Sequence, residues 1–199
     1  MIISPYKGLK PKQWRKKTLK LIQKHPLQRK EIVDVVLGVW DDIFKSGIGK
    51  KPYKIGVDIF PKPQIMGFLL HELIALELRG RHPKDWRGEA DSSDKDLVYI
   101  PDGSYSVEIK TSSHGSKIFG NRSYAQEGRG GKKSKSGYYL AVNFEKCTRE
   151  CSKPRILLIR FGWIDAADWR GQKAATGQQA SLPPEIENSK LIHLFPERQ

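Results

Sequence analysis

Apolar residues recur at spacings of three and four in the first part of the chain, a pattern that predicts helices. A basic amphipathic helix is expected from residue 11 to about residue 24, because a proline at its start suits the first helical turn. The clearest amphipathic helix follows at 28–46 and ends before a glycine. A third helix is expected over about 63–78, and it should be buried because it is apolar nearly all round.

The second part of the chain is rich in β-forming segments. Residues 96–110, DLVYIPDGSYSVEIK, predict a hairpin with its turn at PDG, 101–103. Further strands are expected at 137–145, at 155–165 and in the terminal KLIHLF, 190–195. Helices precede a mostly β part, so the predicted class is α/β of the α+β kind, a central mixed β-sheet flanked by helices. A length of 199 residues suits a single domain.

The charge balance indicates a polyanionic partner. Lysine and arginine total 36 against 22 acids, for a formal net charge of +14, and they are spread along the whole chain. This favours DNA or RNA as the partner, and a membrane surface is the weaker alternative. A third interpretation is that the protein is basic without having a polyanionic partner. No run of 18 apolar residues and no secretory leader pattern occurs, so a cytoplasmic location and no membrane are expected. Cys147 and Cys151 lack a second pair for structural zinc and are interpreted as reduced thiols.

The predicted hairpin brings two acids and a lysine together. With the turn near Asp102, Asp96 faces Glu108, and Lys110 projects from the same face as Glu108. Opposed like charges repel, and a divalent cation resolves the conflict by taking one oxygen from each. Mg²⁺ is expected, with Asp96, Glu108 and the backbone carbonyl of Ile109 as ligands, because it needs few carboxylates and no histidine or cysteine cluster indicates zinc.

A metal in this position suits hydrolysis of a phosphodiester bond. It would polarise the scissile phosphate and lower the pKa of an attacking water. Lys110 would orient or deprotonate that water, or offset charge in the transition state, and the sequence leaves these roles open.

Asp96 and the tripeptide Glu108-Ile109-Lys110 on a β-hairpin resemble the PD-(D/E)xK nuclease superfamily, in which an Asp and an acid-x-Lys tripeptide bind Mg²⁺ and hydrolyse DNA. One departure is Lys95 in place of the proline before the aspartate. The wider pattern, with N-terminal helices and TSSHGSKIFGNRSYAQ after the strand, looks like type II restriction endonucleases of the branch typified by ScaI.

The resemblance implies a restriction-endonuclease-like core and Mg²⁺-dependent, sequence-specific cleavage of double-stranded DNA within a restriction-modification system. A cognate methyltransferase would be linked in function without binding the chain. Because palindromic sites mirror protein symmetry, a homodimer is expected. Within the single nuclease domain, 1–60 would form a helical N-terminal region with the dimer interface, and 61–199 the catalytic core with DNA-contacting loops.

Other members of the superfamily often take a further acid from a helix packed on the sheet, and Glu72 in FLLHELIAL is the best match. Its alternative is an ordinary ion pair with a neighbouring base. Glu77 is a weaker match than Glu72. Asp94, two residues before Asp96, is the rival metal ligand.

The segments after the catalytic strand contain the candidate DNA contacts, although strand-end caps and a solvated charged loop would use the same residue types. Two of these segments, 119–137 and 170–185, have no convincing period and are interpreted as long loops. The candidates are Ser112, Ser113, His114, Asn121, Arg122, Tyr124, Gln126, Arg129, Lys132, Lys133 and Lys135. A second group is Gln172, Gln178 and Gln179.

Two other functions compete with restriction. A structure-selective nuclease, such as a junction resolvase or a repair enzyme, would use the same chemistry on branched DNA. A DNA-binding module without catalysis would keep the carboxylates for structure alone.

Overall fold

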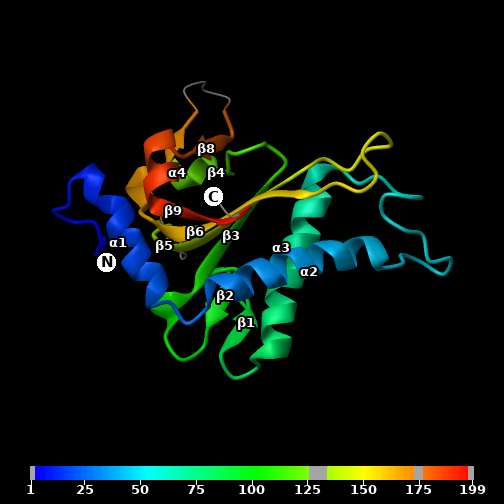
Figure 1. Cartoon of the computed structure of the whole chain (residues 1–199), viewed down its shortest axis with the longest axis horizontal. Coiled ribbons are helices and arrows are strands. Elements are labelled where there is room, and N and C mark those ends of the chain that lie inside the picture. Colours follow the sequence, from blue (N-terminus) through cyan, green and yellow to red (C-terminus); the bar gives the residue numbers. More distant parts are fainter. Residues whose placement is uncertain (1–2, 126–133, 173–176, 197–199) are drawn as a thin grey trace.

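A mixed six-stranded β-sheet forms the centre of the protein in the computed structural model, which describes residues 3–125, 134–172 and 177–196 (Figure 1). Its order is β1-β2-β3-β5-β6-β9. Only β3 and β5 run parallel, and the other neighbouring pairs are antiparallel. The strands are β1 (Trp86–Gly88), β2 (Leu97–Tyr99), β3 (Val107–Ser112), β5 (Gly137–Phe144), β6 (Ile156–Ile164) and β9 (Leu191–Phe195).

The long helices are α1 (Pro11–Gln23), α2 (Arg29–Lys45) and α3 (Pro63–Arg81). Helices α2 and α3 cross each other on one face of this sheet, whereas α1 lies at the side of the sheet and contacts β6 and β9 (Figure 1). Their apolar residues form one core with Val107, Ile109, Leu140 and Val142 of the sheet. These strand positions alternate, so one side of β3 and β5 faces the helices.

A second, smaller layer covers the other face. It contains β4 (Phe119–Asn121), β7 (Arg170–Gly171), β8 (Gln179–Ser181) and α4 (Pro184–Lys190), with the three strands in the order β4-β8-β7. Tyr139 and Ala141 of β5 belong to its apolar cluster. Strand β5 is therefore buried on both faces, as its continuous apolar sequence indicates.

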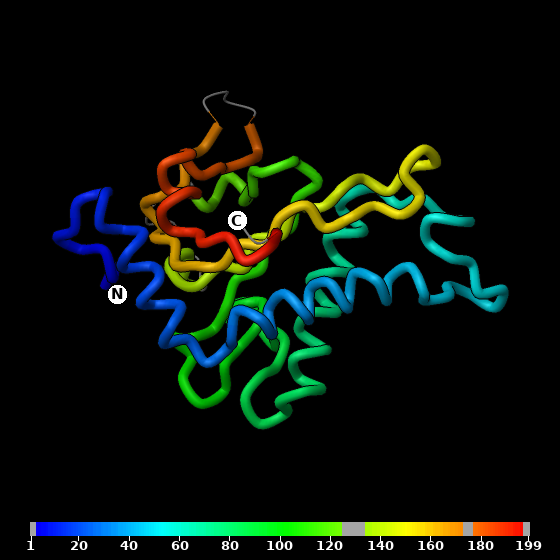
Figure 2. Tube along the Cα trace, viewed as in Figure 1, coloured from blue at the N-terminus to red at the C-terminus, as the bar shows by residue number. Residues whose placement is uncertain are grey.

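The predicted mixed class and central mixed sheet are confirmed, as are the three N-terminal helices and the strands near 137, 155 and 190. Figure 2 follows the chain from these helices through the β2–β3 hairpin to β9, which returns beside β6. The prediction that α3 is buried all round is wrong. Its outward side leaves Ile65, Phe68 and Leu76 exposed, because only one side of the helix meets the sheet.

The hairpin forms in the expected register. Leu97 of β2 pairs with Val107 of β3, and their connection contains a short 3₁₀ turn, η1 (Gly103–Tyr105). Asp102 caps this turn by accepting a hydrogen bond of 2.9 Å from the backbone N–H of Ser104. Asp96, directly before Leu97, and Glu108, directly after Val107, are therefore the next residues on the two arms, on the side of this pair away from the turn.

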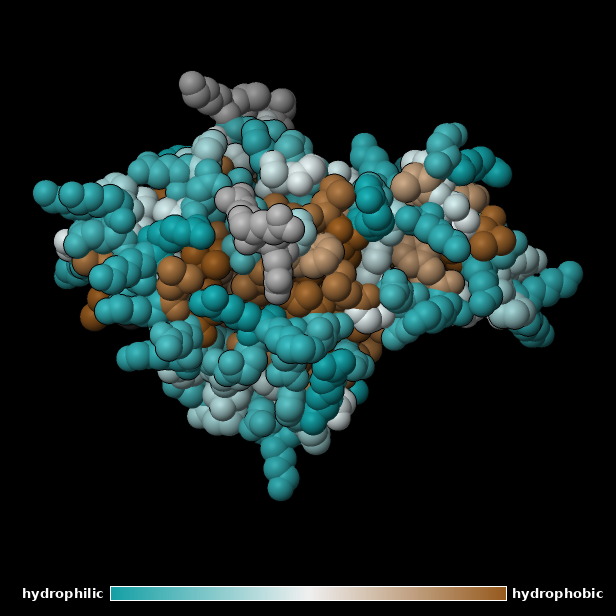
Figure 3. Space-filling model, in the orientation of Figure 1, coloured by the Kyte–Doolittle hydropathy of each residue, from teal (hydrophilic) through white to brown (hydrophobic). Residues whose placement is uncertain are grey.

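A groove with a mostly apolar lining, referred to below as the apolar groove, lies between α2 and the edge strand β9. Its lining includes Leu37, Ile192 and Phe195, and apolar residues gather over the same elements at the centre of Figure 3. None of the helices within the described ranges has the length and apolar character to cross a bilayer.

His25 joins the link between α1 and α2 to the sheet. Its Nε2 lies 2.9 Å from the carbonyl of Tyr105, and its Nδ1 accepts a hydrogen bond of 3.1 Å from the N–H of Leu27. Four aromatic rings surround the imidazole, those of Trp86, Tyr105, Tyr138 and Phe161. Burial lowers the pKa of His25 to about 4, because the charged ring would lose its hydration.

We expect this burial to make stability depend on pH. The pKa of His25 is lower in the folded state than its ordinary value of 6.5, so folding favours the neutral ring above pH 6.5 and loses that advantage as pH falls toward 4. The loss amounts to roughly 3 kcal/mol across this window. Urea unfolding of the wild type and His25→Phe between pH 7.5 and 4 measures it. Equal pH dependence in both proteins would show that His25 is not the titrating group.

Candidate active site at the fork of β2 and β3

The site begins where β2 and β3 diverge. Past the Leu97–Val107 pair, the Oδ2 atom of Asp96 accepts a hydrogen bond of 2.7 Å from the backbone N–H of Ile109. The carboxylate thus takes the place of a ladder partner that β2 no longer supplies. Since the N–H and C=O of a strand residue point to the same edge, the carbonyl of Ile109 also faces this fork.

Glu108 is the most enclosed acid of the site, with 2% of its surface exposed. The ammonium of Lys110 donates to its Oε1 at 2.8 Å, and the hydroxyl of Tyr124 donates to the same oxygen. Lys95 lies 3.7 Å from Oε2. Burial and the charge of Asp96 oppose ionisation, but the charges of Lys110 and Lys95 and the hydrogen bond from Lys110 outweigh them and lower the pKa of Glu108.

A histidine that the sequence analysis missed contacts the other acid. The Nε2 atom of His71 on α3 lies 3.3 Å from Oδ2 of Asp96, and its Nδ1 lies 3.3 Å from Oε1 of Glu72. Burial alone would lower the pKa of His71, but hydrogen bonds to the two carboxylates raise it. The adjacent polar pair His71 and Glu72 inside an apolar helix was the available sequence signal.

The two other candidate acids are placed differently. Glu72 is half exposed and reaches the fork through His71. Asp94 accepts hydrogen bonds of 2.7 Å from Arg87 and 3.0 Å from the N–H of Ala90, and these donors lower its pKa to about 2. The carboxylate of Asp94 therefore binds Arg87 of β1.

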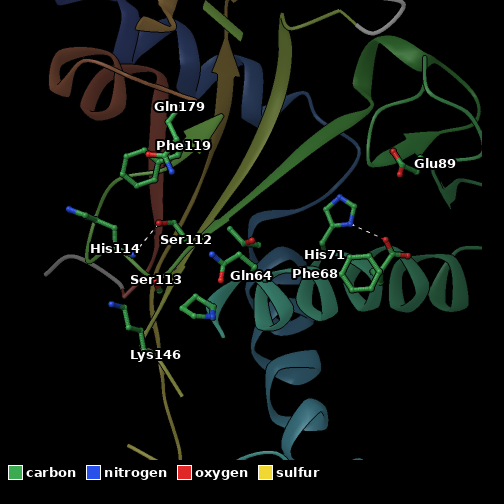
Figure 4. Close-up of a pocket in the computed structure, with 14 residues that line it drawn as sticks. Gln64, Phe68, His71, Glu89, Ser112, Ser113, His114, Phe119, Lys146 and Gln179 are labelled. Carbon is green, nitrogen blue, oxygen red and sulfur yellow. Dashed lines mark hydrogen bonds and ion pairs between the residues drawn. The ribbon is translucent and has the colours of Figure 1, made fainter. Parts of the chain in front are cut away.

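A cleft of about 750 Å³ opens beside the fork, between α3 and the end of β3 (Figure 4). Gln64, Phe68 and His71 line it from α3, and Ser112 and His114 line it from the opposite side. Asp96 and Glu108 are not part of the cleft wall, because they are buried behind it at 6% and 2% exposure.

The candidate DNA contacts lie in several different settings. Ser112, Ser113 and His114 line the cleft, and Asn121 is exposed on β4. Arg122 is half-buried and donates to the carbonyl of Gly177 at 3.0 Å. The residues Gln126, Arg129, Lys132 and Lys133 lie outside the described residues.

Tyr124 differs from the expected position at a DNA surface. Tyr124 is buried with its ring 5.0 Å from that of Trp169, so no open face is left for a base to stack on. The ammonium of Lys135 lies 4.2 Å from the ring centre of Tyr124. Tyr124 therefore belongs with Glu108, to which its hydroxyl donates, and Lys135 contacts the ring of Tyr124.

Comparison with known proteins decides the family. The ScaI restriction endonuclease family model matches residues 4–195. The type II restriction enzyme ScaI of Streptomyces caespitosus is 51% identical over 191 residues, which cover 95% of this chain and 83% of that protein. The chain belongs to the ScaI restriction endonuclease family. The predicted resemblance and the predicted class of enzyme, a type II restriction endonuclease, are thereby confirmed.

Type II restriction enzymes generally use Mg²⁺, and the donor set of this family member suits that ion. Among the described side chains, no three of the His, Cys, Asp and Glu type form a metal-binding group. Two carboxylates and a carbonyl are nevertheless typical for Mg²⁺, which keeps several waters and takes its remaining oxygens from a substrate phosphate. A zinc site would need more nitrogen or sulfur ligands than Asp96, Glu108 and Ile109 offer.

The hydroxyl of Tyr124 should stabilise the buried carboxylate. In Tyr124→Phe, Glu108 loses a donor inside the protein while the ring is kept, so we expect the free energy of unfolding to fall by about 1.5–3 kcal/mol. Urea denaturation measures the change, with Tyr53→Phe on an exposed ring as the control. Equal stability of the two variants would contradict the contact.

Proposed function

We propose that this chain cleaves double-stranded DNA at a specific sequence, with Mg²⁺ bound by Asp96, Glu108 and the carbonyl of Ile109. The supporting observation is the pairing of Lys110 with Glu108 at 2.8 Å on the strand that also holds Asp96 through Ile109. Two acids and an ammonium that lie around one fork support the arrangement that the PD-(D/E)xK resemblance implies. Membership of a restriction endonuclease family favours sequence-specific cleavage over a structure-selective nuclease.

Each residue of the fork has a role that follows from its contacts. When bound, Mg²⁺ supplies charge stabilisation to the phosphate and acidifies water. Lys110 donates a hydrogen bond to Glu108, so we assign it to orienting the attacking water and offsetting charge on the phosphate rather than to removing a proton. His71 of α3 contacts Asp96 and orients it. Tyr124 and Lys95 contact Glu108 and hold its carboxylate in place.

A non-catalytic DNA-binding module fits these contacts less well. Two carboxylates that repel each other in a buried place reduce stability unless cations compensate for them. Such a cluster is typical of functional sites, where charged groups contribute to the reaction although they reduce the stability of the fold.

Removing either carboxylate charge should abolish cleavage. We expect Asp96→Asn and Glu108→Gln to lower the rate of plasmid cleavage in Mg²⁺ at least about a hundredfold, because the cation loses a charged ligand. EDTA should do the same to the wild type. Asp94→Asn is the matched control, since Arg87 and Ala90 hold that acid elsewhere. An inactive Asp94→Asn beside an active Asp96→Asn would transfer the metal site to the rival residue.

The apolar groove between α2 and β9 supports the proposal of a homodimer with an interface that includes part of the N-terminal region. Strand β9 is at the edge of the sheet, and edge strands are the ones that can pair with another chain. Leu37 of α2 lines the groove beside Ile192 and Phe195. A two-fold contact of this surface with itself would bury the groove and the edge together.

A charge in the groove should separate the subunits. We expect Leu37→Lys to sediment as a monomer where the wild type sediments as a dimer, because the introduced ammonium would be desolvated at the interface. Analytical ultracentrifugation reads the outcome, and Val57→Lys, at an exposed position outside the groove, is the control. A dimer that survives Leu37→Lys places the interface elsewhere.

A further inference from the structure

The segment 112–117, which directly continues the catalytic strand into the cleft wall, is fixed from inside the protein. Asn143 of β5 is completely buried, and its Nδ2 donates to the carbonyls of His114 at 2.7 Å and Lys117 at 2.9 Å. Amide donors in an otherwise apolar strand cost desolvation unless they are fully used. Here both protons of the amide bind loop carbonyls.

A buried arginine supports the same loop. The Nη2 atom of Arg160, on β6, donates to the carbonyl of Ser116 at 2.5 Å and to Oδ1 of Asn143 at 3.1 Å. Glu187 of α4 lies 3.7 Å from Nη1 and balances the charge. Residues of β5, β6 and α4 thus hold a surface loop through buried polar groups, an arrangement that makes the loop rigid.

The fixed loop determines which ring nitrogen of His114 carries the proton. Its Nδ1 accepts hydrogen bonds of 3.1 Å from the backbone N–H groups of both Ser116 and Lys117. The ring must therefore carry its proton on Nε2. It also packs edge-on against Phe119 at 6.0 Å between ring centres, and both residues line the cleft (Figure 4).

We propose that His114 is a specificity-determining residue that donates its Nε2–H to an acceptor on a base edge, and that Asn143 and Arg160 position it. This inference rests on the proposed function. A donor held in one orientation suits a purine N7, a guanine O6 or a thymine O4. Phosphates are more often bound by lysine or arginine. Ser112 and Gln179 line the same cleft, and their hydroxyl and amide groups are of the kind that read bases (Figure 4).

Cleavage kinetics on duplexes with single base-pair changes test the proposal. The site is first mapped with wild type and Mg²⁺, and kcat/KM is then measured for the cognate duplex and each changed one. His114→Ala and His114→Asn are compared, because Asn retains an oxygen that accepts the Ser116 N–H while it lacks the Nε2 donor. Both should lower kcat/KM on cognate DNA roughly tenfold and lose discrimination at one base-pair position only.

Two results would overturn the inference while leaving the proposed function intact. Either His114 variants cut like the wild type, or they lose the same factor on every duplex, which would indicate a phosphate contact. His82→Ala, a histidine at the end of α3 outside the cleft wall, is the control and should behave as wild type. A wild-type protein that cuts no DNA in Mg²⁺ overturns the proposed function itself, and this inference with it.

The positioning role has its own variant. Asn143→Asp keeps an oxygen for Arg160 but removes both donors to the loop, so it should relax discrimination at the same base-pair position as the His114 variants. Asn188→Asp, exposed on α4, is the matched control. Circular dichroism and the melting temperature establish that each variant folds. Because His114 is exposed, its variants decide the inference even if Asn143→Asp does not fold, and a folded Asn143→Asp with unchanged discrimination contradicts the positioning role.

Discussion

The buried charge of Glu108 is the constraint on which the rest of the site depends. Strand β3 alternates, so the side that holds Val107 and Ile109 builds the core with the helices, while Glu108 is directed into the opposite layer. The charges of Lys110 and Lys95 outweigh the burial of this carboxylate and lower its pKa, and the hydroxyl of Tyr124 also donates to it. The second layer of the fold therefore also contributes to the site. Tyr124 lies in a turn of this layer, and the small three-stranded sheet holds that turn in place.

The divergence of β2 from β3 gives the site its second acid. A longer β2 would pair with Ile109 and leave no place for Asp96 on its N–H. His71 then ties this acid to α3, so a helix, a hairpin and a loop meet at one fork. The same strand continues past the fork to Ser112, and the cleft that receives DNA in our account thus follows directly from the catalytic strand.

The sequence predicted those features that depend on neighbours along one strand or helix. The hairpin register followed from its turn, and the Glu108–Lys110 contact followed from the strand period. His71 was missed because its contact with Asp96 is tertiary and has no sequence spacing of its own. Tyr124 was assigned to the surface because its polar, glycine-rich surroundings are typical of loops, and nothing local shows that Trp169 covers it. Strands β7 and β8 and helix α4 are short and depend on packing, so periodicity did not reveal them.

The pKa of Glu108 tests the account most directly, because catalysis, metal binding and the packing of the second layer all require this buried carboxylate to stay charged. An NMR titration of its side-chain carboxyl carbon, assigned with Glu108→Gln, would measure it in the metal-free protein. We predict a pKa below the ordinary value of 4.5, since the neighbouring ammonium groups outweigh burial. A pKa raised above that value would show that burial dominates and would contradict the account.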